Sequence, residues 1–100
     1  MKKTKHELAQ DELEARLREK YPDQIIVANR EYYDGDHIAG ETDLLRFIDK
    51  NKVVMYEVKS SKHAHYLRAQ EQYKRFCDHH PDYEIKGVFY HPRHGARRLR

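Results

Sequence analysis

The fold is decided by residues 40–59, GETDLLRFIDKNKVVMYEVK. Two apolar arms, rich in β-branched and aromatic residues, flank a polar break at Lys50-Asn51, and this pattern predicts a β-hairpin. Side chains alternate between the two faces of a strand, so Glu57 and Lys59 are expected on one face. An antiparallel partner joined by a short turn brings Asp43 of the first arm near Glu57.

At the end of an apolar hairpin the two carboxylates repel each other, and burial removes the charged groups from water. This arrangement is unfavourable unless a further charge compensates it. A hard cation such as Mg²⁺ prefers oxygen ligands and would relieve the repulsion between Asp43 and Glu57; Mn²⁺ is an expected substitute. The alternative is a ladder of salt bridges among Asp43, Glu57 and Lys59 on a solvated sheet face.

The chain has 100 residues, of which 37% are charged and 38% hydrophobic. This composition predicts one domain, residues 1–100, with a modest core. The sequence has neither an apolar run long enough for a membrane span nor a signal-peptide pattern, which predicts a soluble, cytoplasmic protein without a membrane partner. Its single cysteine, Cys77, excludes an internal disulfide and is expected to be a structural thiol.

Charge is distributed unevenly along the chain. Residues 1–50 hold nine Lys/Arg and twelve Asp/Glu, whereas residues 51–100 hold eleven and five. The second half is therefore expected to carry a phosphate-binding surface. Its basic tail, residues 92–100, has four arginines and no apolar period, so Arg97 to Arg100 are expected to contact phosphates rather than to pack.

Apolar periodicity predicts the element order αβββαβ. Ala9, Leu13 and Leu17 recur every four residues and predict a helix over residues 5–20, which Pro22 ends. The other expected elements are a strand over 24–29 with Ile25 to Ala28 buried on both faces, a polar connection over 30–40, the hairpin, a helix over 62–79 with a stripe of Leu67, Tyr73, Phe76 and Cys77, and a strand over 84–91. The expected fold is α/β, a mixed four-stranded sheet flanked by helices.

The motif Gly-Glu-Thr-Asp43, an apolar strand and then Glu57-Val58-Lys59 resembles the core of the PD-(D/E)XK nuclease superfamily, and the element order matches its restriction-endonuclease-like fold. The superfamily includes restriction endonucleases, Holliday-junction resolvases and small viral nucleases. The resemblance implies a Mg²⁺-dependent DNA endonuclease that leaves 5′-phosphates. Asp43, Glu57 and the backbone carbonyl of Val58 would bind the metal, and Lys59 would orient or deprotonate the attacking water.

The same resemblance suggests further site residues. Gln72, with Phe76 in place of Tyr, matches a Q-x-x-x-Y motif of exonuclease-like branches, and Gln70 is the rival position. Many members add a glutamate from the first helix, for which the candidates are Glu7, Glu12 and Glu14. Gln10 stands where some resolvase-like members have that glutamate, and Glu41 is an alternative from the hairpin itself.

The small core favours a structure-selective nuclease, acting on junctions, flaps or single strands, over one that reads a long sequence. One site cuts one strand, so a homodimer is expected for duplex or branched DNA. The alternatives are an inactive nuclease-fold module that binds nucleic acid or another partner, and a protein-interaction domain. The eight histidines, including His63 and His65, lack cysteines at zinc-site spacing and are expected to face solvent or phosphate.

Overall fold

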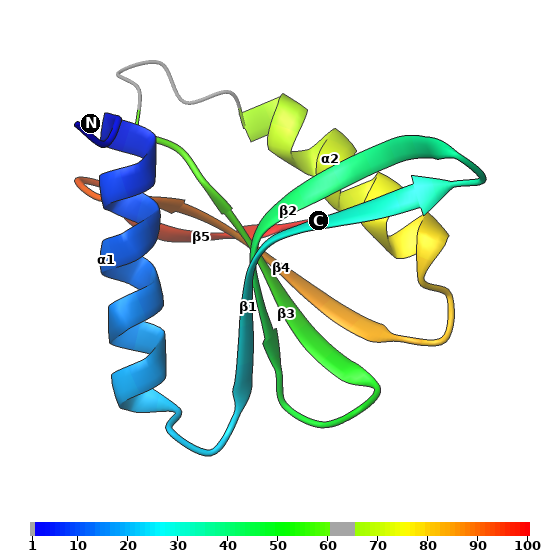
Figure 1. The fold of residues 1–100 in the computed structure, drawn as a ribbon, viewed down its shortest axis with the longest axis horizontal. Coiled ribbons are helices and arrows are strands. Elements are labelled where there is room, and N and C mark those ends of the chain that lie inside the picture. The colour runs from blue at the N-terminus through cyan, green and yellow to red at the C-terminus, as the bar shows by residue number, and fades with distance from the viewer. Residues whose placement is uncertain (1, 61–65) are drawn as a thin grey trace.

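The computed structural model describes residues 2–60 and 66–100, which form an α/β structure with one five-stranded sheet. The elements are α1 (Lys5–Lys20), β1 (Ile25–Asp34), β2 (His37–Phe47), β3 (Lys52–Val58), α2 (Tyr66–His79), β4 (Glu84–His91) and β5 (Gly95–Leu99). The strands follow chain order across the sheet; β3 and β4 are parallel and the other neighbours antiparallel. The two helices lie on opposite sides of the sheet (Figure 1).

Helix α1 begins with a capping box, in which Thr4 and Glu7 satisfy each other's backbone N–H groups. Its buried side chains Ala9, Leu13 and Leu17 lie one turn apart, as predicted, and face the sheet. The sheet residues of this cluster are Ile26, Leu44, Val54, Tyr56, Val58 and Tyr90. This face therefore receives every second residue of β3, as strand alternation requires.

Helix α2 covers the other face of the sheet through Phe76 and Ala69, which are 2% and 0% exposed. Phe76 packs with the alternate residues of the central strands, Leu45, Val53 and Met55, and with Tyr32. The predicted stripe is wrong at Leu67, whose side chain is 75% exposed. The predicted start of this helix at residue 62 lies outside the described residues.

The polar connection predicted over residues 30–40 is wrong, because β1 and β2 continue through it as one long hairpin. The turn at Asp34–His37 is made possible by Gly35, whose φ of +63° suits glycine. Tyr32 packs against Gly40 so closely that a Cβ there would lie 2.3 Å from the tyrosine hydroxyl oxygen. The structure thus builds strands from residues that the sequence pattern assigns to a loop.

The predicted unpatterned tail is also wrong, because residues 95–99 form β5 against β4 and raise the strand number from four to five. Leu99 is 1% exposed and packs with Ala69 and Phe89. At the other edge of the sheet, Ile26 is buried against α1 as expected, but Ile25 points to the opposite face of β1 and is 67% exposed. Among the described residues, no helix is long and apolar enough to cross a membrane.

Candidate functional site

The sheet separates between β2 and β3 at Asp43 and Glu57. The last paired residues of the two strands are Leu44 and Tyr56. Beyond this pair β2 continues only with β1, whereas β3 continues with β4, where Glu57 lies beside Phe89. Strands that part leave backbone donors and acceptors without ladder partners, so side chains must replace them.

Asp43 provides that replacement. Its Oδ2 accepts the backbone N–H of Val58 at 2.8 Å, which a neighbouring strand would otherwise have bound. On its other side, Nε2 of His6 lies 3.4 Å from Asp43 Oδ1. The carboxylate is thus fixed between β3 and α1.

The backbone of Asp43 is held separately by a buried glutamine of α1. Gln10 is 6% exposed, and its Nε2 donates to the carbonyl oxygen of Asp43 at 3.1 Å and to Oδ1 of Asn29 at 2.8 Å. Asn29 has a φ of +52°, a conformation that is uncommon for a non-glycine residue. It interrupts β1 between Ala28, which pairs with Leu44, and Arg30, which pairs with Thr42.

Glu57 is a buried carboxyl group, 2% exposed. Burial raises its pKa to about 8, and the negative charges of Asp43 and Glu41 add to the rise, while the ammonium of Lys59 opposes it. The solvated salt-bridge ladder is therefore the wrong alternative, because such a ladder requires Glu57 to face water. Glu57 lies on the α2 face of β3, in register with Met55.

The Oε1 atom of Glu57 is buried and has no hydrogen-bond partner within residues 2–60 and 66–100. A buried acceptor without a partner is unfavourable by about 1–3 kcal/mol, and a cation or a hydrogen-bond donor at this position would satisfy it. In the same described residues, no group of three or more His, Cys, Asp or Glu side chains could hold a metal. Two carboxylates are the donor set with which Mg²⁺ is often held, since it keeps several waters and takes further oxygens from phosphates.

Lys59 follows β3 and is half-buried. Its backbone N–H donates to the carbonyl oxygen of Tyr90 at 2.9 Å, which extends the β3–β4 pairing by one residue. This bond fixes where the chain leaves the sheet, two residues after Glu57. The positive charge of the Lys59 ammonium opposes the rise in the pKa of Glu57.

The two glutamines proposed on α2 are in different surroundings. Gln70 Nε2 donates to the carbonyl oxygen of Arg100 at 3.3 Å, so it contacts the end of the chain. Gln72 is one turn before the buried Phe76, and its Oε1 is buried without a partner in the described part of the chain. Because Phe76 packs on the α2 face of the sheet, Gln72 lies on the same side of the sheet as Glu57.

The three candidate glutamates of α1 contact their own helix. Glu7 accepts the backbone N–H of Thr4, and the carboxylates of Glu12 and Glu14 pair with arginines one turn later, at 2.7 and 2.9 Å. Instead, α1 brings His6 and Gln10 to Asp43. The sequence held a signal for both, because they extend the stripe of Leu13 and Leu17 by whole turns toward the N-terminus.

Among the described residues, the cysteine and the histidines do not join Asp43 and Glu57, apart from His6. Cys77 is half-buried, and burial raises the pKa of its thiol. His80 stacks on Tyr83 and packs against Phe76, with ring centroids 5.4 and 4.2 Å apart. His63 and His65 are outside the described residues.

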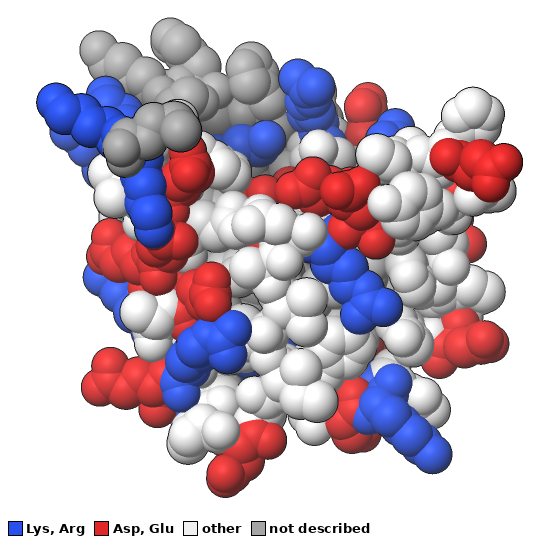
Figure 2. Space-filling view, viewed as in Figure 1, with Lys and Arg blue, Asp and Glu red and all other residues white. Residues whose placement is uncertain are grey.

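Charge on the surface is mixed in the view of Figure 2, where acidic and basic side chains alternate around an uncharged centre. The pairs on α1 contribute to this mixture, because Arg16 and Arg18 lie beside Glu12 and Glu14. Comparisons with protein-family models and with curated proteins find no match to this chain.

Proposed function

We propose that the chain is a Mg²⁺-dependent DNA endonuclease of the PD-(D/E)XK type. The observation that carries this proposal is the pair Asp43 and Glu57, two carboxyl groups gathered where β2 and β3 separate, with Lys59 two residues further on. Glu57 is held in a place that disfavours its charge, and one of its oxygens has no partner among the described residues. A divalent cation would supply the compensation that this site needs.

Asp43 and Glu57 would hold the metal with the backbone carbonyl of Val58. When bound, Mg²⁺ supplies positive charge for the phosphate oxygens and makes nearby water more acidic. Lys59 would place its ammonium beside the attacking water and offset negative charge that develops in the transition state. Gln72 would orient water or phosphate from α2, and His6 and Gln10 keep Asp43 in position.

The substrate would be a junction, flap or single-stranded region of DNA. A core of this size has few elements beyond those that build the site, so recognition of a long base sequence would need surfaces that the described sheet and helices do not supply. Products with 5′-phosphates and a homodimer on branched DNA belong to the same proposal.

The test is cleavage of plasmid, single-stranded and branched DNA in Mg²⁺, Mn²⁺ or EDTA. Wild-type protein should cleave with either metal and not in EDTA. Asp43→Asn, Glu57→Gln and Lys59→Ala should each abolish cleavage; the asparagine retains an acceptor for the Val58 N–H, so the fold is preserved. Asp82→Asn, an exposed acid in the turn before β4, is the matched control and should cleave normally. Binding of DNA without cleavage in any metal would instead favour the inactive nuclease-fold module.

A further inference from the structure

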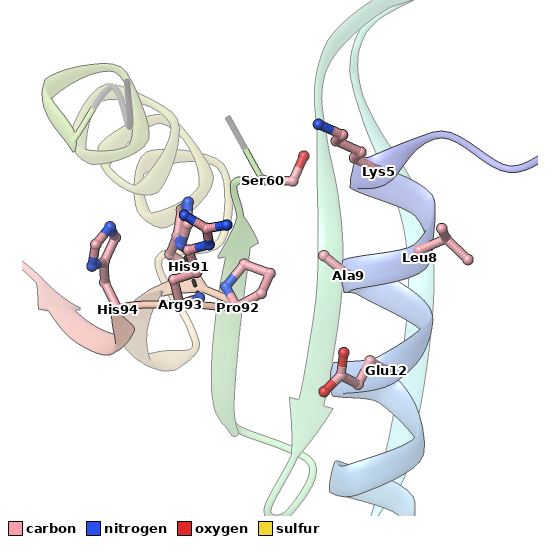
Figure 3. A pocket seen from close by; sticks show the side chains of 9 residues that line it. All are labelled: Lys5, Leu8, Ala9, Glu12, Ser60, His91, Pro92, Arg93 and His94. Atoms are coloured by element: carbon pink, nitrogen blue, oxygen red, sulfur yellow. Dashed lines mark hydrogen bonds between the residues drawn. The ribbon is translucent and has the colours of Figure 1, made fainter. Parts of the chain in front are cut away.

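A groove of about 570 Å³ lies between the first half of α1 and the turn that joins β4 to β5 (Figure 3). Its volume falls within the range of about 300–1,000 Å³ that is usual for small-ligand sites. It is on the α1 face of the sheet, whereas Glu57 is on the α2 face. Neither Asp43 nor Glu57 lines the groove, although Asp43 contacts His6 of the same helix.

The walls of the groove combine cationic and apolar side chains. Lys5 projects from α1 and Arg93 from the β4–β5 turn, both exposed, and Ser60 adds a hydroxyl group between them (Figure 3). Ala9 and Pro92 provide apolar surface on the two sides. Among the described lining residues Glu12 is the one acid, and its charge is partly balanced by Arg16 at 2.7 Å.

The β4–β5 turn is held in a defined shape. His91 pairs with Gly95 across the turn, and Gly95 takes a φ of +76°, which favours glycine. The backbone N–H of Arg93 donates to Nδ1 of His91 at 3.0 Å. The rings of His91 and His94 lie with their centroids 4.6 Å apart. Arg93 and a flat aromatic surface are thus presented together at the groove.

The groove begins where the candidate site ends. Ser60 directly follows Lys59, and the backbone of Lys59 is bound to Tyr90, the neighbour of His91. A nucleic-acid strand that crosses the carboxyl end of β3 with one phosphate at Asp43 and Glu57 would bring an adjoining nucleotide over Ser60. The carboxyl ends of parallel strands are a common place for ligands, and β3 and β4 are the parallel pair here.

We propose that this groove binds an unpaired nucleotide next to the phosphate that is cleaved, an inference that rests on the proposed nuclease function. Lys5 and Arg93 contact its phosphate, and its base lies between Ala9 of α1 and Pro92 of the turn. A nucleotide joins an anionic group to a flat apolar one, which is the combination that these walls offer. A base held in the groove is separated from its partner strand, so the site selects single-stranded or flapped DNA over intact duplex.

The experiment measures binding of a fluorescent single-stranded oligonucleotide, and of a duplex of equal length, in EDTA across a salt series. The double variant Lys5→Gln/Arg93→Gln should bind the single strand several-fold more weakly than wild type. The slope of log affinity against log salt should fall by about 0.7 for each phosphate that the variant no longer neutralises. The control, Lys20→Gln/Lys50→Gln, removes the same charge at the last residue of α1 and in the turn between β2 and β3. Neither residue lines the groove, so this variant should retain wild-type slope and affinity.

Two further variants test the rest of the groove. Pro92→Asp places an acid on the apolar wall and should weaken binding of the single strand more than binding of the duplex. Glu12→Gln removes the acid and should strengthen binding of both. Equal affinities for the groove variant and the control variant would overturn the proposal.

The same measurement separates this inference from the nuclease proposal. Glu57→Gln should lose cleavage while it retains single-strand binding in EDTA, because Glu57 is buried, does not line the groove and can meet a phosphate only through a metal that EDTA removes. If wild-type protein proves inactive yet the groove variants bind weakly, the nuclease function fails and the groove stands. If cleavage is normal and the groove variants bind like the control, the groove fails and the nuclease function stands.

Discussion

Glu57 is the residue whose surroundings most clearly disfavour its charged form. A carboxyl group that is nearly removed from water and lies near Asp43 stays protonated until the pH reaches about 8. The charged form of such a group destabilises the folded protein, because burial removes the carboxylate from water. Strain of this kind is concentrated at functional sites, because chemistry needs groups that folding alone would exclude.

The raised pKa of Glu57 predicts how stability depends on pH in EDTA. The folded protein prefers the protonated carboxyl, so its contribution to the free energy of unfolding is full below pH 4.5 and is lost progressively as the pH rises to about 8. Each unit of pKa difference corresponds to about 1.4 kcal/mol. Glu57→Gln should therefore remove a decline of a few kcal/mol over this window, measured by urea unfolding at several pH values.

Addition of Mg²⁺ gives this prediction an independent check. A cation that binds the ionised carboxylate should restore stability to the wild-type protein at pH 8 and leave Glu57→Gln unchanged. Parallel pH curves for the two proteins would show that Glu57 is not the group that titrates.

Residue identity alone could single out Asp43, Glu57 and Lys59 as candidates, because their spacing on a hairpin is readable without coordinates. The helical stripe places His6 and Gln10 toward the sheet, but their contacts with Asp43 could not be predicted from it. Their role depends on how α1 crosses the sheet and on the left-handed conformation of Asn29, neither of which a local pattern specifies. A buried amide that binds the backbone of a candidate ligand is a tertiary feature.

At the scale of elements, β5 shows why composition can mislead. Arg97, Arg98 and Arg100 look like a solvated end, yet Leu99 between them is buried and β5 pairs with β4 along its length. The arginines are also engaged: the guanidinium of Arg97 lies 3.8 Å from the ring centre of Tyr66, and Tyr66 donates to the carbonyl oxygen of Arg98. An edge strand needs only one apolar residue in the core, which is too short a pattern to detect.

Deletion of residues 97–100 should therefore act first on stability. Loss of the buried Leu99 alone should lower the free energy of unfolding by about 2–5 kcal/mol, and β4 would become an unprotected edge. Thermal unfolding of the truncated chain should occur well below that of wild type. Arg98→Gln is the matched control, because Arg98 is exposed, and it should unfold like wild type. A truncated chain of unchanged stability would contradict the packing of β5.

The outer part of the long β1–β2 hairpin is not predicted from the sequence, for a related reason. Asp34-Gly35-Asp36 is a strong turn signal, and the polar residues around it lower the apparent strand propensity of the arms. The arms are nevertheless stabilised by tertiary contacts, since Tyr32 packs against Phe76 with ring centroids 5.5 Å apart. Such contacts override local propensity, whereas the apolar β3 and β4, which are buried between two helices, are predictable from their runs alone.

At the scale of the whole molecule, the elements are arranged so that the residues of the candidate site lie at one end of the sheet. β3 and β4 end there in parallel, β2 separates there from β3, and α1 begins there. The α/β class, both helices and four of the strands follow from periodicity. The separation of β2 from β3 does not, because it depends on β2 choosing β1 as its partner beyond Asp43.

One site in each chain leads to the last prediction, which rests on the proposed function. A single centre cuts one strand, so paired cuts in a branched DNA require two chains acting together. On a plasmid that extrudes a cruciform, wild-type protein should yield linear product, whose two cuts occur within the lifetime of one complex. Mixing with excess Glu57→Gln chain should form mixed dimers with one active site and convert linear product into nicked circles. The alternative result is that linear product falls only in proportion to the dilution of active chain, with no rise in nicked circles. That result would show that the chains cut independently.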